Sequence, residues 1–302
     1  MIQITRILCP IDFSEFSRHA LDHAMAIARL YGSRVIVLHV FPLAVEAVPF
    51  AGLDPQPFVL HAAERVRLLA RMKAFAAAES GAGFGVDCVV REGVDIHAEI
   101  LAETDALDPD LLVMGTHGRS GFQHLVLGSV TEQVLRKADC PVLTVPRRAP
   151  AAVPTGPILY TRILCGVDFS ECSLAALAYA RSLAAESQAL LEVVNVVNLL
   201  PIADPPAPIP SYYPGLLEEL QAHARTRLRD TISALTPPPV PVNEIVTTGK
   251  PHQEIVRLAA ERKAELIVLG VHGSGVIDRM IFGSTTNHVV RQATCPVLTI
   301  RT

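Results

Sequence analysis

A glycine-containing segment holds the residues best suited to chemistry. Gly115-Thr-His-Gly118 follows an apolar run and is followed, after nine residues, by Gly128-Ser129. Glycines let a backbone approach a ligand closely, and the unpaired N–H groups at a helix start favour an anion. The spacing therefore predicts a phosphate-binding loop. A pair of tight turns without a ligand is the alternative.

The same pattern occurs a second time. Gly270-Val-His-Gly273 leads, again after nine residues, to Gly283-Ser284. Upstream of both loops, RILCPIDFS and RILCGVDFS place Asp12 and Asp168 at matching positions, 156 residues apart. Two copies of one motif with one spacing favour the ligand interpretation over the tight-turn alternative.

A repeat of this length is too long for a solenoid and indicates a domain duplication. The chain has 302 residues, and about 150 residues per domain is an ordinary size. We expect one domain at 1–147, a Pro- and Ala-rich linker at 148–158 that acts as a spacer, and a second domain at 159–302.

Composition narrows the class of protein. Hydrophobic residues make up 50% of the chain, which suits buried parallel strands covered by helices. The net charge is −4, with no Lys/Arg run longer than two, so we expect no nucleic-acid partner. We also expect no membrane span, since no apolar stretch is long enough, and a cytoplasmic location, since no signal peptide opens the sequence.

The elements that must position these loops alternate along each copy. In the first copy, short apolar runs predict strands at 6–11, 35–40, 87–91, 111–114 and 142–145. Helical patterns separate the runs, the first beginning at Ser14, a good N-cap, and stopping at Gly32. This alternation predicts an α/β fold with a parallel sheet. We expect two tandem doubly wound domains, each a five-stranded parallel sheet with helices on both faces.

Four motifs together resemble the universal stress protein family: DFSE after the first strand, HV ending the second, G-x2-G-x9-G-S, and CPVL. The resemblance covers nearly the whole chain. It implies a Rossmann-like strand order of 3-2-1-4-5, which places Asp12 and Gly115 beside the crevice where such sheets bind ligands. It also implies ATP as ligand, with AMP or ADP as alternatives and Mg²⁺ as a companion ion.

The resemblance further implies which residues hold the nucleotide. The Asp and Val would hold the nucleoside end, and the glycine loop with its hydroxyls would hold ribose and phosphates. In copy one these residues are Asp12, Val40, Gly115, Gly118, Gly128, Ser129 and Val130. In copy two they are Asp168, Val196, Gly270, Gly273, Gly283, Ser284 and Thr285. Copy one matches the ATP-binding pattern through GSVTE, whereas copy two reads GSTTN. Arg119 is a candidate phosphate partner whose counterpart is Ser274.

Other interpretations of single residues stay open. Asp12 and Asp168 could be helix-start acids only. Ser129 and Glu132 have the spacing of a capping box. Four histidines recur at matching positions and could touch phosphate, order the loops or, less favoured, bind zinc: His97, His117, His252 and His272. Four matching cysteines are expected to be reduced and to fill space in strands: Cys9, Cys140, Cys165 and Cys295.

Several catalytic motifs are absent from the sequence. It contains no GxxxxGK[ST] loop and no GxSxG nucleophile, so we expect a weak ATPase at most.

Three functions compete: a nucleotide-dependent stress or signalling module with an unknown protein partner, a slow ATPase timer, and a tandem sensor with empty pockets. We also expect the final strands, 141–145 and 296–300, to face each other, two chains to form a homodimer, and the 198–215 loop to border the second pocket.

Overall fold

The computed structural model describes residues 2–43, 60–77, 85–118, 127–146, 160–198, 215–235, 240–271 and 282–302. The chain divides into two compact units, Gln3–Pro157 and Ile158–Thr302 with Met1–Ile2. They are called copy one and copy two below, and each is described by itself. The domain limits at 147 and 159 stay a prediction, because the expected linker lies outside the described residues.

Within its described residues, copy one is built on five parallel strands. They are β1 (Arg6–Pro10), β2 (Arg34–Pro42), β3 (Val86–Gly93), β4 (Leu111–Gly115) and β5 (Val142–Val145). Their order is β3-β2-β1-β4-β5, so the predicted order is confirmed. The side chains of Ile7, Leu8 and Cys9 in β1 are fully buried, which explains the unbroken apolar run of this strand.

Copy two repeats this arrangement. Its described strands are β6 (Arg162–Gly166), β7 (Leu190–Val197), β8 (Val242–Thr248), β9 (Leu266–Gly270) and β10 (Val297–Ile300). They are parallel and lie in the order β8-β7-β6-β9-β10. The connections diverge between β6 and β9, as they do between β1 and β4.

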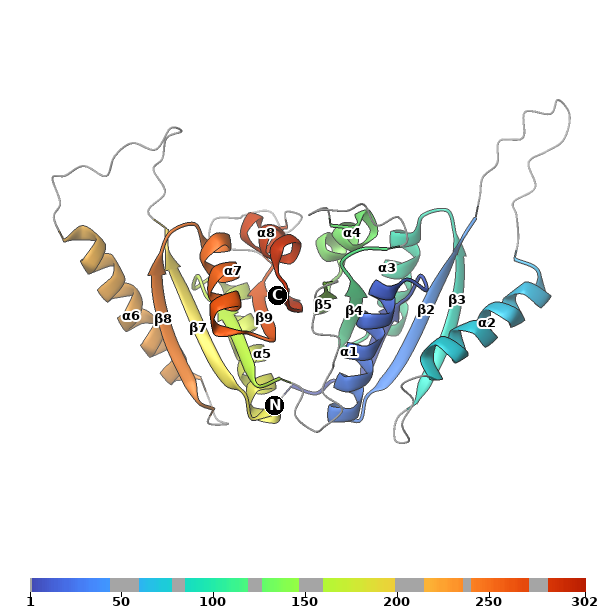
Figure 1. The fold of residues 1–302 in the computed structure, drawn as a ribbon, viewed down its shortest axis with the longest axis horizontal. Helices are drawn as coiled ribbons and strands as arrows, with labels where there is room; N and C mark the ends of the chain where they lie inside the picture. Colours follow the sequence, from blue (N-terminus) through green and yellow to red (C-terminus); the bar gives the residue numbers. More distant parts are fainter. Residues whose placement is uncertain are drawn as a thin grey trace, which may run out of the picture. The chain divides into compact units, whose positions relative to one another are not determined.

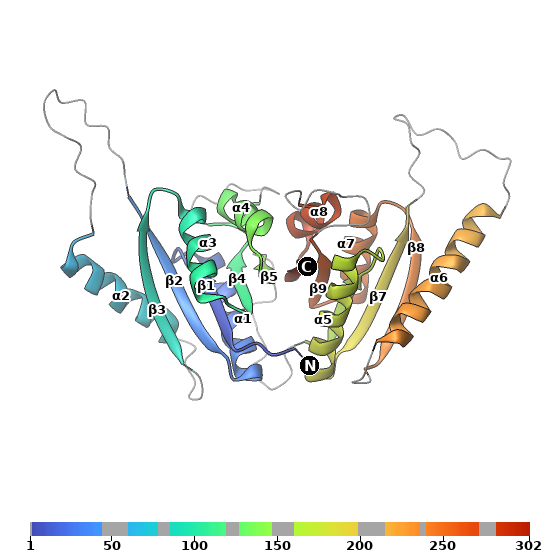
Figure 2. The same cartoon turned by 180° about the vertical axis from the view of Figure 1, so that it is seen from behind.

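Helices cover both faces of each sheet. In copy one they are α1 (Glu15–Tyr31), α2 (Ala62–Ala77), α3 (Ile96–Leu107) and α4 (Ser129–Lys137). In copy two they are α5 (Glu171–Ser187), α6 (Leu216–Ala234), α7 (Pro251–Arg262) and α8 (Ser284–Gln292). Figures 1 and 2 show opposite sides of the molecule, with α1 and α2 on one face of the first sheet and α3 and α4 on the other.

The predicted ends of α1 are confirmed. Ser14 is the N-cap, and its side chain accepts a hydrogen bond from the backbone N–H of Ser17. Gly32 closes the helix in the left-handed region, at φ 68°, and its N–H donates to Ala28 O. Both ends are set by local sequence, so the β1–α1 turn enters the helix in a defined direction.

All six cysteines are free thiols. Cys9 and Cys165 are buried in β1 and β6, as predicted. The expectation that Cys140 and Cys295 lie in strands is wrong, because each precedes a proline that has no N–H for the ladder, and the strand begins after it. Burial raises the pKa of both of these thiols to about 12. Among the described residues, no helix combines the length and apolar character that crossing a bilayer requires.

Candidate functional site

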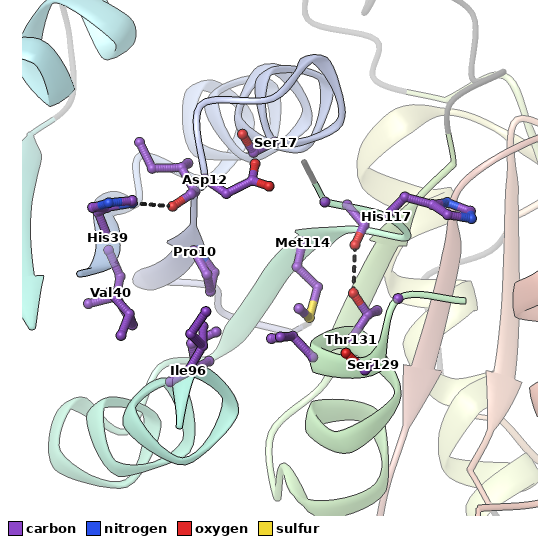
Figure 3. A pocket seen from close by; sticks show the side chains of 17 residues that line it. Pro10, Asp12, Ser17, His39, Val40, Ile96, Met114, His117, Ser129 and Thr131 are labelled. Atoms are coloured by element: carbon purple, nitrogen blue, oxygen red, sulfur yellow. Dashed lines mark hydrogen bonds between the residues drawn. The ribbon is translucent and has the colours of Figure 1, made fainter. Parts of the chain in front are cut away.

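A cavity of about 320 Å³ lies in copy one at the carboxyl ends of β1, β2 and β4. Asp12, His39, Val40, Ile96, Met114 and Thr131 surround it (Figure 3). Its wall also includes predicted loop and helix-start residues: Gly115, Gly118, Gly128, Ser129 and Val130. The cavity therefore sits at the point where the strand order reverses, the usual ligand position in open α/β sheets.

Asp12 lies in a turn in which hydrogen bonds hold successive residues. The N–H of Ile11 donates to Leu38 O at 2.8 Å, and the Nδ1–H of His39 donates to Ile11 O at 2.7 Å. The Oδ1 of Asp12 accepts from both the N–H and the hydroxyl of Ser14, at 3.0 and 2.5 Å. Asp12 thus orders the helix start and also lines the cavity, so the two interpretations of this residue are compatible.

The first two glycines of the copy-one loop have different physical roles. A Cβ on Gly115 would lie 3.0 Å from Phe16 Cβ, so this glycine lets α1 approach the end of β4. On Gly118, a Cβ would lie 2.9 Å from Asp12 Oδ2, so this glycine lets the loop approach the aspartate. Gly115 therefore serves helix packing as well as lining the cavity, whereas Gly118 lies beside the carboxylate of Asp12.

The start of α4 corrects one prediction. Gly128 is the N-cap, and within the described residues no side chain caps the helix, so the Ser129–Glu132 capping box is wrong. Ser129 is already the first helical residue, one position too late to cap. Glu132 instead pairs with Arg136 at 2.9 Å, and the Thr131 hydroxyl donates to Gly115 O at 2.9 Å. Ser129 and Thr131 lie on the cavity side of α4 (Figure 3).

Copy two repeats the aspartate turn. The Oδ1 of Asp168 accepts from the N–H and hydroxyl of Ser170, at 3.0 and 2.6 Å. Asn195 takes the place of His39, and its Nδ2–H donates to Val167 O at 2.8 Å. Val196 follows Asn195 in β7, at the position that Val40 holds in β2. The same turn is therefore built twice, from partly different side chains.

The loop ends of copy two also match. A Cβ on Gly270 would lie 2.7 Å from the backbone carbonyl carbon of Cys172, so this glycine admits α5 as Gly115 admits α1. Gly283 is the N-cap of α8, and Ser284 and Thr285 are its first helical residues. Three predicted loop positions lie outside the described residues: Arg119, Gly273 and His272.

The histidines that the structure describes do not form a metal site. His117 packs beside Phe16, with ring centroids 5.3 Å apart, and its ring points away from the cavity (Figure 3). The Nδ1 of His97 lies 2.5 Å from the Asp95 carboxylate. In the part of the chain that the structure describes, no three His, Cys, Asp or Glu side chains group as metal ligands.

Sequence reasoning missed several residues around this site. His39 appears in the sequence only as the first residue of the HV motif, yet its ring ties the end of β2 to the aspartate turn. Ile96, Ile100 and Met114 form an apolar wall that no motif marks. Phe13 follows Asp12, and the repetition of DFS in both copies is a sequence signal that could have identified it.

Comparison with known proteins identifies the family. The model of the universal stress protein family matches residues 3–146 and again 159–301. A universal stress protein of Mycolicibacterium smegmatis is 26% identical over 305 residues, which cover 98% of this chain and 96% of that protein. Another, from Mycobacterium tuberculosis, is 28% identical over 197 residues, which cover 64% of this chain and span only 62% of that relative's length.

A solved structure agrees on the fold. The crystal structure of a universal stress protein from Archaeoglobus fulgidus matches with a TM-score of 0.68 at 22% identity, covering 99% of both chains. At this identity the likeness concerns the fold alone. The two matches to the family model show that this chain belongs to the universal stress protein family and carries two copies of its domain in tandem.

Proposed function

We propose that the chain binds an adenine nucleotide, ATP in the first place, in the cavity of copy one. The observation that carries this proposal is the convergence of Asp12, Gly118 and the start of α4 on one cavity at the switch point of the sheet. Ser129 and Val130 begin α4 there, where unpaired N–H groups and the helix dipole favour phosphate.

The residues present fit such a ligand. Val40, Ile96 and Met114 offer an apolar wall to a flat base, and the Asp12 carboxylate offers an acceptor to a hydroxyl or amino group. Gly118 leaves open a space that a side chain would fill, beside that carboxylate. When bound, the nucleotide would supply the phosphate charge, and the chain's own residues would orient it.

Copy two is proposed as a second, weaker site. Its proposed ligand-holding residues are Asp168, Val196, Gly270, Gly273, Gly283, Ser284 and Thr285. We expect copy one to bind ATP about tenfold more tightly, because Arg119 can form a charge-assisted contact with phosphate, whereas Ser274 carries no charge. Calorimetric titration of Arg119→Ser should reveal that loss, whereas an affinity equal to the wild type would remove Arg119 from the site.

We further propose that nucleotide occupancy changes a surface read by a protein partner, in the cytoplasm, with two chains forming a homodimer. A slow ATPase timer is the second candidate, with Mg²⁺ bound alongside the nucleotide, and a tandem with empty pockets is the third. The pairing of the final strands and the border role of the 198–215 loop stay predictions. Most of that loop lies outside the described residues.

One experiment tests the central proposal. The protein is purified, denatured, and its supernatant analysed by chromatography for released adenine nucleotide. Release of ATP near one equivalent supports a stable site, and release of ADP supports the timer. If nothing is released and calorimetry with ATP and Mg²⁺ shows no heat of binding, the pockets are empty and the proposal is wrong.

A further inference from the structure

The residue after each candidate aspartate has an unusual backbone conformation. Phe13 and Phe169 lie in the left-handed region, at φ 63° and 66°. Bulky residues rarely adopt this conformation, and they keep it only where the surrounding structure holds them there. Because the outlier occurs in both copies beside Asp12 and Asp168, specific contacts must hold each turn in place.

In each copy an arginine from a distant helix covers the phenylalanine ring. The guanidinium carbon of Arg71, on α2, lies 4.0 Å from the centroid of the Phe13 ring. That of Arg227, on α6, lies 4.1 Å from the centroid of the Phe169 ring. Both distances are typical of a cation–π contact. The two arginines occupy matching positions in the repeat, so the same clamp is built twice.

We propose that Arg71 and Arg227 are positioning residues, each holding the aspartate turn of its copy in the conformation that receives the nucleotide. This inference rests on the proposed function and deepens it. The arginine does not line the described cavity. In copy one Arg71 acts through the ring of Phe13, which lies between Asp12 and the N-cap Ser14 in the sequence. The clamp thereby links α2 to the ligand-facing carboxylate.

Other contacts that stabilise the turn of copy one are hydrogen bonds to Ile11 and Asp12, the two residues before Phe13. His39 and Leu38 bond to Ile11, and Ser14, the N-cap of α1, bonds to Asp12. His39 also packs against Phe13, with ring centroids 4.8 Å apart. The clamp adds a contact from a separate element, an exposed helix. Of the described residues of α2, only Met72 and Ala76 are buried, so the packing of α2 in the core does not explain Arg71.

Within the residues that the structure describes, the clamp of copy one includes further aromatic contacts. Phe75, one turn after Arg71, meets Phe13 edge-on, with centroids 5.5 Å apart and planes at 82°. Arg18 of α1 lies 4.0 Å from the Phe75 centroid and also donates to Phe75 O. Copy two has Thr231 and Leu174 at the positions of Phe75 and Arg18. Among the described residues, the turn of Asp12 is therefore held by more ring contacts than the turn of Asp168.

The test uses Arg71→Met, which removes the cation and keeps an apolar stem, with Arg227→Met as the matched control. Two readouts are taken on the full chain. The first is the hydrogen-exchange rate of the Ser14 amide without nucleotide, because this N–H donates to Asp12 Oδ1. The second is ATP affinity by calorimetry in an Asp168→Ala background, which leaves copy one to bind. We expect Arg71→Met to speed Ser14 exchange and weaken ATP roughly threefold to tenfold.

Arg227→Met should leave both copy-one readouts unchanged and speed exchange at Ser170 instead. Unchanged Ser14 exchange in Arg71→Met overturns the proposal. If the parent binds no ATP, the proposed function fails, and the exchange rate alone still decides whether Arg71 holds the turn. A further cycle separates the clamp from a general charge effect: in a Phe13→Leu background, Arg71→Met should weaken ATP no further. A full loss in that background would show that Arg71 acts through its charge and not through the ring.

Discussion

The aspartate turns of copies one and two are built from the same backbone contacts, whereas the side chains around them differ. Asp12 and Asp168 each accept from the N–H of a serine two residues on, at 3.0 Å in both copies. The side chain that ties the second strand to the turn is His39 in one copy and Asn195 in the other. An imidazole and a carboxamide are interchangeable here because each offers one N–H to the same carbonyl. Backbone geometry is therefore the repeated feature.

In contrast to the backbone of the turn, the residues around it differ between the copies, both at the end of the first strand and before the third helix. Copy two has Gly166 where copy one has Pro10, and a Cβ on Gly166 would lie only 2.6 Å from Leu269 Cδ2. A side chain at Gly166 would therefore require Leu269 to move, whereas copy one accommodates a proline at this position. The turn before the third helix of each copy also changes, from Val94-Asp95-Ile96 to the shorter and cationic Lys250-Pro251. The copies therefore share the backbone of the aspartate turn and differ in the side chains around it.

The largest expected difference comes from Gly118→Val. The new side chain would meet the Asp12 carboxylate, from which a Cβ alone is 2.9 Å away, and would block the loop from approaching a phosphate. We expect ATP affinity in copy one to fall by more than about a hundredfold, or about 3 kcal/mol. Calorimetric titration measures the loss, and circular dichroism checks that the domain stays folded, because this position lies in a loop.

Gly273→Val is the matched variant in copy two. It should leave the tighter site intact and remove only weaker binding. If ATP binding survives in Gly118→Val and disappears in Gly273→Val, copy two is the main site and the ranking of the copies is reversed.

How far the sequence could predict this structure depends on the range of the interaction. The strand positions, the cap at Ser14 and the stop at Gly32 were predictable, because apolar period and local capping decide them. The strand order followed from the resemblance to the family and not from these local patterns. The missed cap at α4 is a one-residue shift of a helix boundary, which local pattern does not resolve. The role of Gly115 depends on Phe16 arriving from another element. For the same reason, the contact between Arg71 and Phe13 could not be read from either segment alone.

The next largest effect concerns acid stability, which should differ between the copies. His23 on α1 is buried, and burial, with the nearby charge of His19, lowers its pKa from 6.5 to about 4. Tyr179 stands at the matching position on α5. As pH falls from about 6.5 to about 4, the unfolded chain takes up a proton that folded copy one excludes. Copy one should therefore lose about 2–3 kcal/mol over this range.

His23→Gln tests that expectation by removing the titrating group. Segment-resolved hydrogen exchange at pH 7, 5 and 4 should show the acid loss of protection in α1 of the wild type and a flatter profile in the variant. An equal acid loss in both proteins would assign the effect to other groups.

Smaller effects are expected where glycine serves helix packing. A Cβ on Gly270 would lie 2.7 and 2.8 Å from backbone atoms of Cys172 and Ser173, whereas a Cβ on Gly115 would lie 3.0 Å from Phe16 Cβ. The Cβ on Gly115 would also lie 3.1 Å from backbone atoms of Phe16, so both variants press on helix backbone and the closer approach at Gly270 decides the ranking. Gly270→Ala should destabilise copy two by about 2 kcal/mol and Gly115→Ala should destabilise copy one by about 1 kcal/mol. Urea unfolding measures both. The reverse ranking would show that α5 shifts more easily than α1.

The smallest expected effect concerns the charges around the matching histidines at the start of the third helix of each copy. His252, at the start of α7, stacks on His288 of α8 with ring centroids 4.5 Å apart. Burial lowers the pKa of His252, and the positive charges of His288 and Lys250 lower it further. The matching His97 instead lies beside the carboxylate of Asp95.

Lys250→Ala should therefore raise the pKa of His252, and added salt should raise it in the wild type by screening the same repulsion. An NMR titration of the imidazole protons measures both shifts, with Lys263→Ala, at the far end of α7, as the control. If Lys250→Ala leaves the His252 titration where it is in the wild type, burial alone sets this pKa, and the rims of the two copies do not differ in the way their charges suggest.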